Sequence, residues 1–331
     1  MNNTLAHPRQ GRLDKNSVQK VSRSDMFFAG AGTMIDKAMN VEEAMKLSGN
    51  DFLVATGSVF DPDMQAIPDY KRIYRTDTGA TLGISGKTFV PIQQAEGMAI
   101  GQTIVNDFDA NIVVMGNVKG GKQVWAVLEI GESFKIGGEE HKEYMILFNA
   151  HTGRCSYKAL MTPHRSACFN IVNPSIKLAG REQRLVTIRH TANYDVRVQE
   201  ARRIMQGANR YYDLAKAQMQ SLVEQKFTKQ DFEKLSLELF PRPQLTKSGD
   251  EPSKRAITNW EDQIAGLTTA YHLDNLNNIR ETKYGAFNAV QWYADKGRPV
   301  KGDALKQLET MFLRPIEDTG LKDEALVLLT R

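Results

Sequence analysis

Short runs of β-branched and aromatic residues, separated by turn residues, dominate the first half of the chain. Such runs predict strands, and they fall at residues 52–60, 71–76, 81–85, 111–118, 123–130, 143–149 and 155–161. Gly120 and Gly121 stand between two of these runs and favour a tight hairpin turn, because glycine adopts positive φ at no steric cost. Pro163 is expected to end the last run. The pattern predicts an antiparallel β-meander.

The second half of the chain has apolar residues at helical spacing. Thr228 is a good N-cap for one of the predicted helices, and Pro241 and Pro243 end it. The predicted helices cover residues 195–225, 229–239, 254–271, 283–294 and 303–313, after earlier ones at 41–47 and 93–108 and a buried helix that begins within 165–173. Strands followed by helices predict the α+β class: an antiparallel β-meander and hairpin core with a packed helix, then a mostly helical C-terminal half.

The chain divides into four predicted regions. A flexible basic arm covers residues 1–25, and an α+β core domain covers 41–190. Long helices continue the core over 191–245, and a helical C-terminal region covers 254–331. The polar residues between the last two regions contain Gly and Pro, which is typical of a linker.

The composition is that of a soluble globular protein, with 41% hydrophobic and 25% charged residues among 331. No apolar run approaches the roughly 20 residues that cross a bilayer, and the first residues lack the apolar segment of a signal peptide. Two cysteines argue against a disulfide scaffold and for a reducing compartment. We therefore expect a cytoplasmic protein without a membrane partner.

Positive charge is concentrated in one segment. Residues 151–210 hold 11 Lys and Arg against 3 Asp and Glu, whereas residues 1–150 hold 15 against 18 and residues 211–331 hold 17 against 18. Such a local excess in a chain of net charge +4 indicates a polyanionic partner. Arginine predominates in the segment, and its planar guanidinium suits phosphate oxygens.

The basic residues of this segment and of the hairpin tip are the predicted nucleic-acid-binding residues. Basic side chains that follow a backbone, with aromatic rings that stack on bases, are the usual mode of single-strand binding, and Tyr194, Tyr211 and Tyr212 lie among the arginines. The alternative is that the arginines solvate a long helix or pair with Glu200 and Asp213. The predicted set is Lys119, Lys122, Arg154, Lys158, Arg165, Lys177, Arg181, Arg184, Arg189, Arg197, Arg202, Arg203 and Arg210.

Evidence for catalytic chemistry is weak. His151, Cys155, His164 and Cys168 form a legitimate zinc ligand set of two imidazoles and two thiolates, but buried cysteines more often act as small core residues. A nucleophile formed by Cys168 with His151 or His164 lacks any family-specific motif around it. The hairpin tip lacks the spacing of a phosphate-binding loop. No metal, cofactor or nucleotide hydrolysis is therefore expected.

Several motifs together resemble a phage and plasmid family, domain of unknown function 932. They are RTDTGATLG at 75–83, FVPIQ at 89–93, GKQVWA at 121–126, NAHTG at 149–153, TPHRSACFN at 162–170, Arg189 with His190, and YGAFNAV at 284–290. The resemblance implies a protein of phage or plasmid origin in the cytoplasm of a bacterial host. The order of strands, hairpin and helices is also similar to the core of single-strand annealing proteins such as Redβ, RecT and Erf, a resemblance of architecture alone.

Three functional hypotheses follow. The first is a homo-oligomer, a ring or a filament, that is not an enzyme and that binds or anneals single-stranded DNA in recombination or replication. The second is a phage-encoded protein that binds a host factor or a replication protein and no nucleic acid. The third is a zinc-dependent enzyme built on the four His and Cys residues above.

Overall fold

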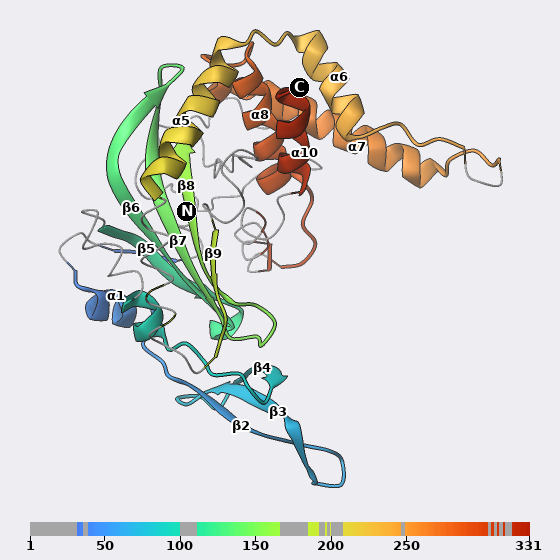
Figure 1. Ribbon diagram of the computed structural model, residues 1–331. Helices are drawn as coiled ribbons and strands as arrows, with labels where there is room; N and C mark the ends of the chain where they lie inside the picture. The colour runs from blue at the N-terminus through green and yellow to red at the C-terminus, as the bar shows by residue number, and fades with distance from the viewer. Residues whose placement is uncertain are drawn as a thin grey trace.

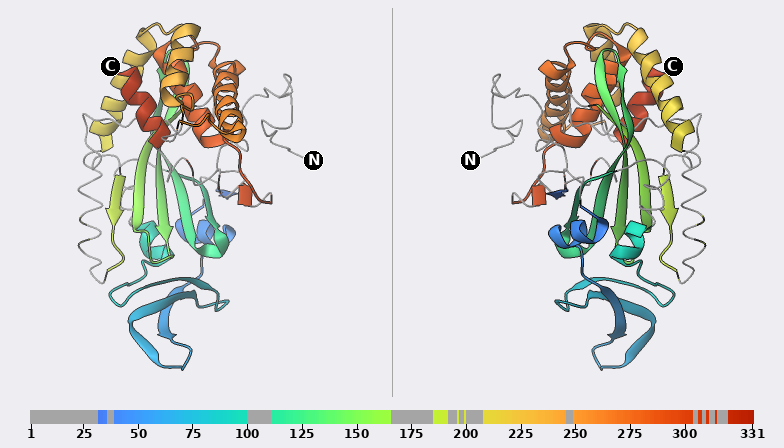
Figure 2. Two further views of the ribbon diagram at one scale, coloured as in Figure 1. Left: turned by 90° about the vertical axis from the view of Figure 1, so that its right-hand side faces the viewer. Right: turned by 90° about the vertical axis from the view of Figure 1, so that its left-hand side faces the viewer.

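Two antiparallel sheets and a group of helices make up the protein (Figure 1). The computed structural model describes residues 32–35, 39–99, 111–165, 185–191, 208–245, 249–303 and 320–331, with a few single positions between them. The helices after residue 208 gather at one end of the larger sheet, and the smaller sheet lies beyond its other end (Figures 1 and 2). The predicted α+β class is confirmed.

The larger sheet is the predicted meander with a strand added at each edge. Its order is β1-β5-β6-β7-β8-β9, and each neighbouring pair is antiparallel. The strands are β1 (Thr33–Met34), β5 (Asn111–Val118), β6 (Gln123–Ile136), β7 (Glu139–Ala150), β8 (Tyr157–Arg165) and β9 (Leu185–Ile188). Strands β6 and β7 exceed their predicted lengths, because pairing resumes after a register shift between Ile130 and Phe134.

Pro163 does not end its strand, contrary to the prediction. Strand β8 continues to Arg165, and Pro163 lies opposite Glu143 of β7. Strand β9 pairs with β8 only over Tyr157–Leu160 in the described part of the chain. Proline is tolerated in a strand where its missing N–H faces an unpaired side. Because Arg165 belongs to β8, the predicted helix does not begin there; residues 166–184 lie outside the described residues.

Both faces of the larger sheet are buried in apolar cores. Strand β7 carries the continuous apolar run Tyr144–Phe148, in which Met145 and Leu147 face one core and the alternate residues face the other. A strand with two buried faces has such a run in place of alternation. The first core also includes side chains of the C-terminal helices, so these helices pack on the sheet.

The helices largely match their predicted positions. Thr228 caps its helix through a capping box with Asp231, as expected. The helices are α1 (Val41–Leu47), α5 (Ala208–Glu224), α6 (Lys229–Leu239), α7 (Lys254–Tyr271), α8 (Lys283–Trp292) with the π-helical turn Tyr293–Gly297, and α10 (Gly320–Leu329). Helix α10 was not predicted. The predicted helices at 93–108, 195–225 and 303–313 are described only in part.

Two buried polar contacts join the helices to each other and to the sheet. The Tyr284 hydroxyl of α8 donates to Nε2 of His141 on β7 at 2.6 Å. His141 Nδ1 donates to the Glu139 carbonyl at 2.9 Å, which leaves Nε2 as the acceptor. Lys322 of α10 forms a fully buried ion pair with Asp295 at 2.8 Å. Buried ionic partners are costly to separate, so α10 is held to the π-helical turn.

The smaller sheet has the order β2-β3-β4 and its own core. The strands are β2 (Val54–Phe60), β3 (Ala66–Arg75) and β4 (Thr81–Gly86). One face buries Val54, Ile73 and Leu82 with Phe52, Phe89 and Val124. Val124 belongs to β6, so this core is shared with the start of the larger sheet. The β2–β3 hairpin protrudes from the molecule (Figure 1).

Glycines allow the smaller sheet to approach the β7–β8 loop at backbone distance. A Cβ at Gly83 would overlap the backbone of Thr152, and a Cβ at Gly153 would overlap the Ile84 carbonyl. Gly153 also has φ +76°, which L side chains rarely adopt. The Ser85 hydroxyl donates to the Gly153 carbonyl at 3.3 Å. Strand β4 is therefore fixed against the end of the larger sheet.

We predict that Gly83→Ala lowers the free energy of unfolding by about 2 kcal/mol or more, because a backbone must move to admit the methyl group. Gly86→Ala on the same strand is the matched control, since a Cβ there meets no atom closer than 4.0 Å. Urea unfolding of both variants measures the difference. Equal stability of the two variants would contradict the close contact.

Candidate nucleic-acid interface

One end of the larger sheet collects basic residues from three separate connections. Strand β5 ends and β6 begins at the 119–122 turn, β7 ends and β8 begins at the 151–156 loop, and β9 ends at Ile188. Because these strands are antiparallel neighbours in order, the three positions lie at the same end of the sheet. We call Lys119, Lys122, Arg154 and Arg189 the basic rim.

The rim faces solvent and carries positive charge. Lys119, Arg154 and Arg189 are exposed, and Lys122 is partly exposed. Lys122, Arg154 and Arg189 form no ion pair with a carboxylate among the residues that the structure describes. Arg75 of β3 lies beside the rim but is paired with Asp77, whose pKa is lowered to about 2 chiefly by the Arg75 hydrogen bond. Arg75 is therefore not counted in the rim.

The two hairpin turns of the rim are joined by backbone and side-chain contacts. The His151 N–H donates to the Lys122 carbonyl at 2.8 Å. The Arg75 guanidinium lies 3.8 Å over the ring of Phe52 and contacts the Gly120 carbonyl at 3.5 Å. Lys119 and Gly120 have φ of 54° and 68°, the positive values that the tight turn requires. The turn is thus positioned by both sheets.

A buried polar cluster lies behind the rim and consists of Gln94, Asn149, His151 and His190. The Gln94 amide donates to Nε2 of His151 at 2.7 Å, and Asn149 donates to the Gln94 side-chain oxygen at 3.2 Å. The Ile92 N–H donates to Nδ1 of His190 at 3.2 Å, and Phe89 stacks on that ring. The cluster ties the segment around Ile92 to the ends of β7 and β9.

His151 of this polar cluster holds structure and is poorly placed for proton transfer. His151 is fully buried, and burial, with a smaller effect of His190, lowers its pKa to about 3. It is therefore neutral at pH 7, with its proton on Nδ1 because Nε2 accepts from Gln94. A general acid or base must reach its reactant and titrate near the working pH. His151 meets neither requirement.

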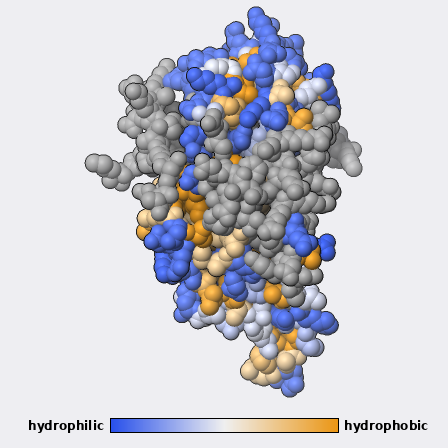
Figure 3. Space-filling view, turned by 60° about the vertical axis from the view of Figure 1, so that its left-hand side comes forward, coloured by the Kyte–Doolittle hydropathy of each residue, from blue (hydrophilic) through white to orange (hydrophobic). Residues whose placement is uncertain are grey.

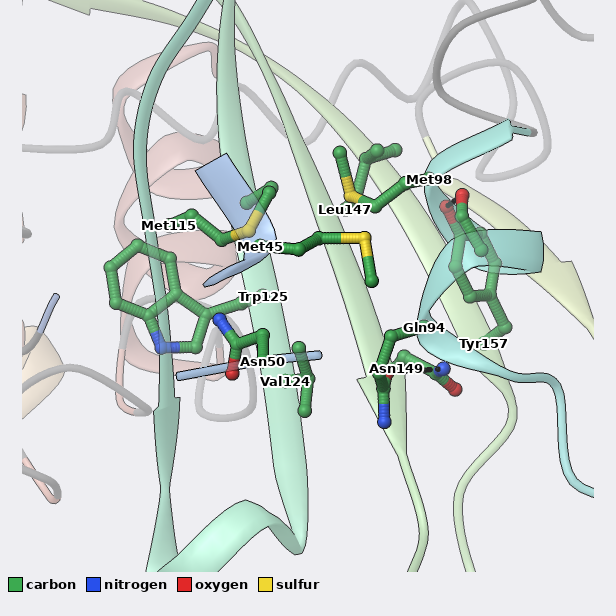
Figure 4. A pocket seen from close by; sticks show the side chains of 12 residues that line it. Met45, Asn50, Gln94, Met98, Met115, Val124, Trp125, Leu147, Asn149 and Tyr157 are labelled. Atoms are coloured by element: carbon green, nitrogen blue, oxygen red, sulfur yellow. Dashed lines mark hydrogen bonds between the residues drawn. The ribbon is translucent and has the colours of Figure 1, made fainter. Parts of the chain in front are cut away.

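A small cavity lies beside the polar cluster (Figure 4). It has a volume of about 20 Å³ and is lined mainly by apolar side chains. Met45 and Met98 point toward it, with Gln94 and Asn149 at its polar side (Figure 4). Small-molecule sites usually measure roughly 300–1,000 Å³, so this cavity is too small for a cofactor or a drug-sized substrate.

The predicted binding residues separate into three groups. Lys119, Lys122, Arg154, Lys158 and Arg189 lie at or next to the basic rim, as the register of β8 places Lys158 opposite Thr187. Arg165 lies at the opposite end of β8, about 24 Å away along the strand, and Arg210 begins α5. The remaining predicted residues lie outside the described residues: Lys177, Arg181, Arg184, Arg197, Arg202 and Arg203.

The predicted zinc ligand set does not assemble. His151 ends β7 and Cys155 lies in the following loop, whereas His164 pairs with Lys142 near the far end of β8. Seven residues of strand separate Tyr157 from His164, which is about 24 Å, far beyond the span of one tetrahedral ion. Cys168 lies outside the described residues. The structure therefore does not bring together the ligand set on which the hypothesis of a zinc-dependent enzyme depends.

The stacking tyrosines predicted from the sequence lie on or near the long helix, and Tyr70 and Tyr74 of β3 were not among them. Tyr212 is buried, and its hydroxyl donates to the Tyr144 carbonyl at 2.7 Å, so it is closed to a base. Tyr194 and the side chain of Tyr211 lie outside the described residues. Tyr70, Arg72 and Tyr74 occupy every second position of β3, in the sequence DYKRIYR. This spacing could have predicted that they share one face of a strand.

Comparison with known proteins identifies the family. A family model described as a domain of unknown function, DUF932, matches residues 81–323. The chain belongs to the DUF932 family. The matched part of this DUF932 protein contains β4, the basic rim and the C-terminal helices, whereas β2 and β3 precede it. No curated protein and no solved structure matches the chain.

Within the described part of this DUF932 protein, no helix has the length and apolar character needed to cross a membrane. The longest described helix, α7, has 18 residues and includes Lys254, Arg255 and Asp262. Its buried side chains lie near its C-terminal end.

We predict that acid destabilises the DUF932 protein through His151. The unfolded chain binds a proton near the ordinary histidine pKa of about 6.5, and the folded chain binds it only near pH 3. Between these values the unfolded state holds more protons, so stability falls as pH decreases below about 6.5, by up to about 1.4 kcal/mol per pH unit. Urea unfolding between pH 7.5 and 5 measures the slope.

The slope should be shallower in His151→Gln, which keeps a polar side chain but removes the titrating ring. His272→Gln is the comparison variant. His272 is exposed at the end of α7 and its pKa is also lowered, chiefly by partial burial, so its removal should reduce the slope less than that of the fully buried His151. If His151→Gln retained the full slope of the unmodified protein, the acid sensitivity would arise elsewhere.

Proposed function

We propose that this protein binds single-stranded DNA at the basic rim and promotes annealing of complementary strands, in the recombination or replication of a phage or plasmid. The observation that carries the proposal is the collection of Lys119, Lys122, Arg154 and Arg189 at one end of the sheet. These residues come from connections up to 70 positions apart in the chain, so the fold converts a dispersed charge into a local one.

The chemistry needed at such an interface is modest. Phosphate neutralisation releases condensed counterions, and this release supplies most of the affinity for a nucleic-acid backbone. Base pairing drives annealing, so the protein need only reduce the repulsion between strands. The polar cluster behind the rim is buried, which leaves the exposed rim cations as the groups that meet the phosphates. No nucleotide hydrolysis or cofactor enters the proposal.

Assembly into a homo-oligomer is part of the proposal, because annealing over a long strand needs several neighbouring sites. The protruding β2–β3 hairpin supports an intermolecular contact. Its apolar side chains Phe60 and Met64 are exposed by 51% and 73%, and hydrophobic surface appears at the lower end of the molecule in Figure 3. A large exposed apolar group at a protruding tip favours a protein partner.

The same hairpin favours a second candidate function, binding of a host or replication protein without nucleic acid. Salt distinguishes the two candidates. Binding to phosphates weakens steeply with salt, by a slope of about −0.7 per phosphate contact for single strands, whereas a packed protein interface has a shallow dependence. The second candidate would be favoured if the protein bound no DNA and bound a host protein with an affinity that depended little on salt concentration.

We predict that the double variant Arg154→Glu, Arg189→Glu loses at least about 10-fold in affinity for single-stranded DNA and shows a shallower salt dependence, because two phosphate contacts become repulsive. Fluorescence anisotropy with a labelled oligonucleotide across a salt series measures both quantities. Arg255→Glu is the matched control, since Arg255 is exposed at the start of α7, away from the rim.

A second pair of variants locates the site if the rim is wrong. Unchanged affinity in the rim variant, with a large loss in Arg202→Glu, Arg203→Glu, would place the interface in the segment before α5. Unmodified protein that binds neither single-stranded nor duplex DNA at low salt would exclude the proposed function.

A further inference from the structure

The outward face of β3 carries an alternating set of aromatic and basic side chains. Residues two apart in a strand share a face, so Tyr70, Arg72 and Tyr74 lie together, opposite the buried Ile73. Ile84 of β4 pairs with Arg72 and lies on the same face. Tyr70 and Ile84 are each 53% exposed, so this face is open to solvent. We call these four residues the β3 platform.

Small residues surround the platform on both neighbouring strands. Gly86 pairs with Tyr70, Gly57 pairs with Arg72, and Ala55 pairs with Tyr74. A Cβ added at Gly57 would touch the Tyr74 ring at 3.4 Å, so the ring lies over the glycine. Aromatic side chains flanked by glycine or alanine leave their ring faces uncovered. The platform is therefore a flat aromatic surface in the middle of a sheet.

Arg72 is held in place above this surface. Its Nε donates to the Thr81 hydroxyl at 2.8 Å, and its guanidinium also donates to the Gly79 carbonyl. The guanidinium lies 4.9 Å from the centre of the Tyr74 ring, within the range of a cation–π contact. No carboxylate neutralises Arg72 among the described residues. A fixed, charged and planar group is thus stacked on an aromatic ring.

The two strands that carry the platform also contact the turns of the basic rim. Arg75, the last residue of β3, contacts the Gly120 carbonyl of the β5–β6 turn. Ser85, next to Ile84, contacts the Gly153 carbonyl of the β7–β8 loop. The smaller sheet is therefore bordered by both basic turns, which contact the side of this sheet that carries Ile73, opposite the platform.

We infer that the β3 platform binds the unpaired bases of single-stranded DNA, by stacking on Tyr70 and on the Arg72–Tyr74 pair. Aromatic and guanidinium planes accept bases in this way, and duplex DNA keeps its bases stacked internally. This inference rests on the proposed function and deepens it. The rim supplies affinity for any backbone, and the platform supplies the preference for single strands. Strand β3 precedes the part of the chain that the family model matches.

The test compares Tyr70→Ala with the unmodified protein on three labelled probes: a single strand, a duplex, and an abasic strand of the same length. We expect the unmodified protein to bind the single strand at least about 10-fold more tightly than the abasic strand, and Tyr70→Ala to lose most of that difference, because stacking is sensitive to loss of the ring. Affinity for the abasic strand should stay the same.

Three controls define the role of the ring. Tyr70→Phe retains the aromatic face and should retain the affinity. Leu237→Ala removes an exposed apolar side chain of α6, 48% exposed, and should have no effect. Arg72→Lys retains the charge but not the plane, so it should lower the affinity for the single strand and leave the salt dependence unchanged. Thermal unfolding of each variant confirms that the fold is intact.

The outcomes separate the inference from the proposed function. Equal, salt-dependent binding of the single strand and the abasic strand by the unmodified protein would overturn the platform and leave the rim intact. Normal single-strand affinity in both Tyr70→Ala and Arg72→Lys would overturn it as well. If the unmodified protein bound no probe at low salt, the proposed function would fail and the platform with it.

Discussion

The contact between β4 and the β7–β8 loop determines how the candidate interface is built. At Gly83 and Gly153 the two backbones approach so closely that neither position has room for a side chain. Such contacts are stiff, because backbone atoms cannot rotate away as a side chain can. The smaller sheet is therefore fixed to the larger one at the place where the basic turns emerge. Without this contact the smaller sheet, which carries the β3 platform, would be free to move relative to the basic rim.

The polar cluster complements this contact from the inside. Gln94, Asn149, His151 and His190 connect segments that are remote in sequence, through hydrogen bonds from Gln94 to His151, from Asn149 to Gln94 and from the Ile92 N–H to His190. Networks of this kind specify one arrangement more sharply than apolar packing does. The burial that keeps His151 neutral also means that this ring adds no charge of its own to the interface. The exposed positive charge at this end of the sheet is carried by the rim side chains.

Local signals in the sequence predicted much of the fold. The capping residue Thr228 and the paired glycines at 120 and 121 act over a few positions, and both features are present as predicted. Pro163 misled the strand prediction, because whether a proline is tolerated depends on which neighbour its N–H would face. That is a property of the assembled sheet. Strand β3 was predicted from residue 71 only, but it begins at Ala66. Pro68 lies where β3 has no paired residue in β2.

The candidate site was predictable in charge but not in place. Counting basic residues identified the 151–210 segment, yet Lys119 and Arg154 are neighbours at the sheet end only because the strand order brings two hairpin turns together. Arg165 shows the converse, since it lies close to Lys158 in sequence and about 24 Å from it along β8. Charge in the sequence therefore led to a hypothesis about the class of partner, whereas the place of the candidate interface depends on pairing between strands.

In the proposed function, the arrangement separates the recognition of phosphates from the recognition of bases. The rim cations occupy turns, where long side chains reach outward and adapt to a flexible backbone. The platform occupies the centre of a sheet, where small neighbours and the hydrogen bonds of Arg72 hold planar groups in fixed positions. Adaptable charges suit phosphates, which are alike in every nucleic acid, and fixed planes suit bases, which are exposed only in unpaired strands. The proposed annealing reaction uses both, because the base contacts are lost as each base pair forms while the phosphate contacts persist.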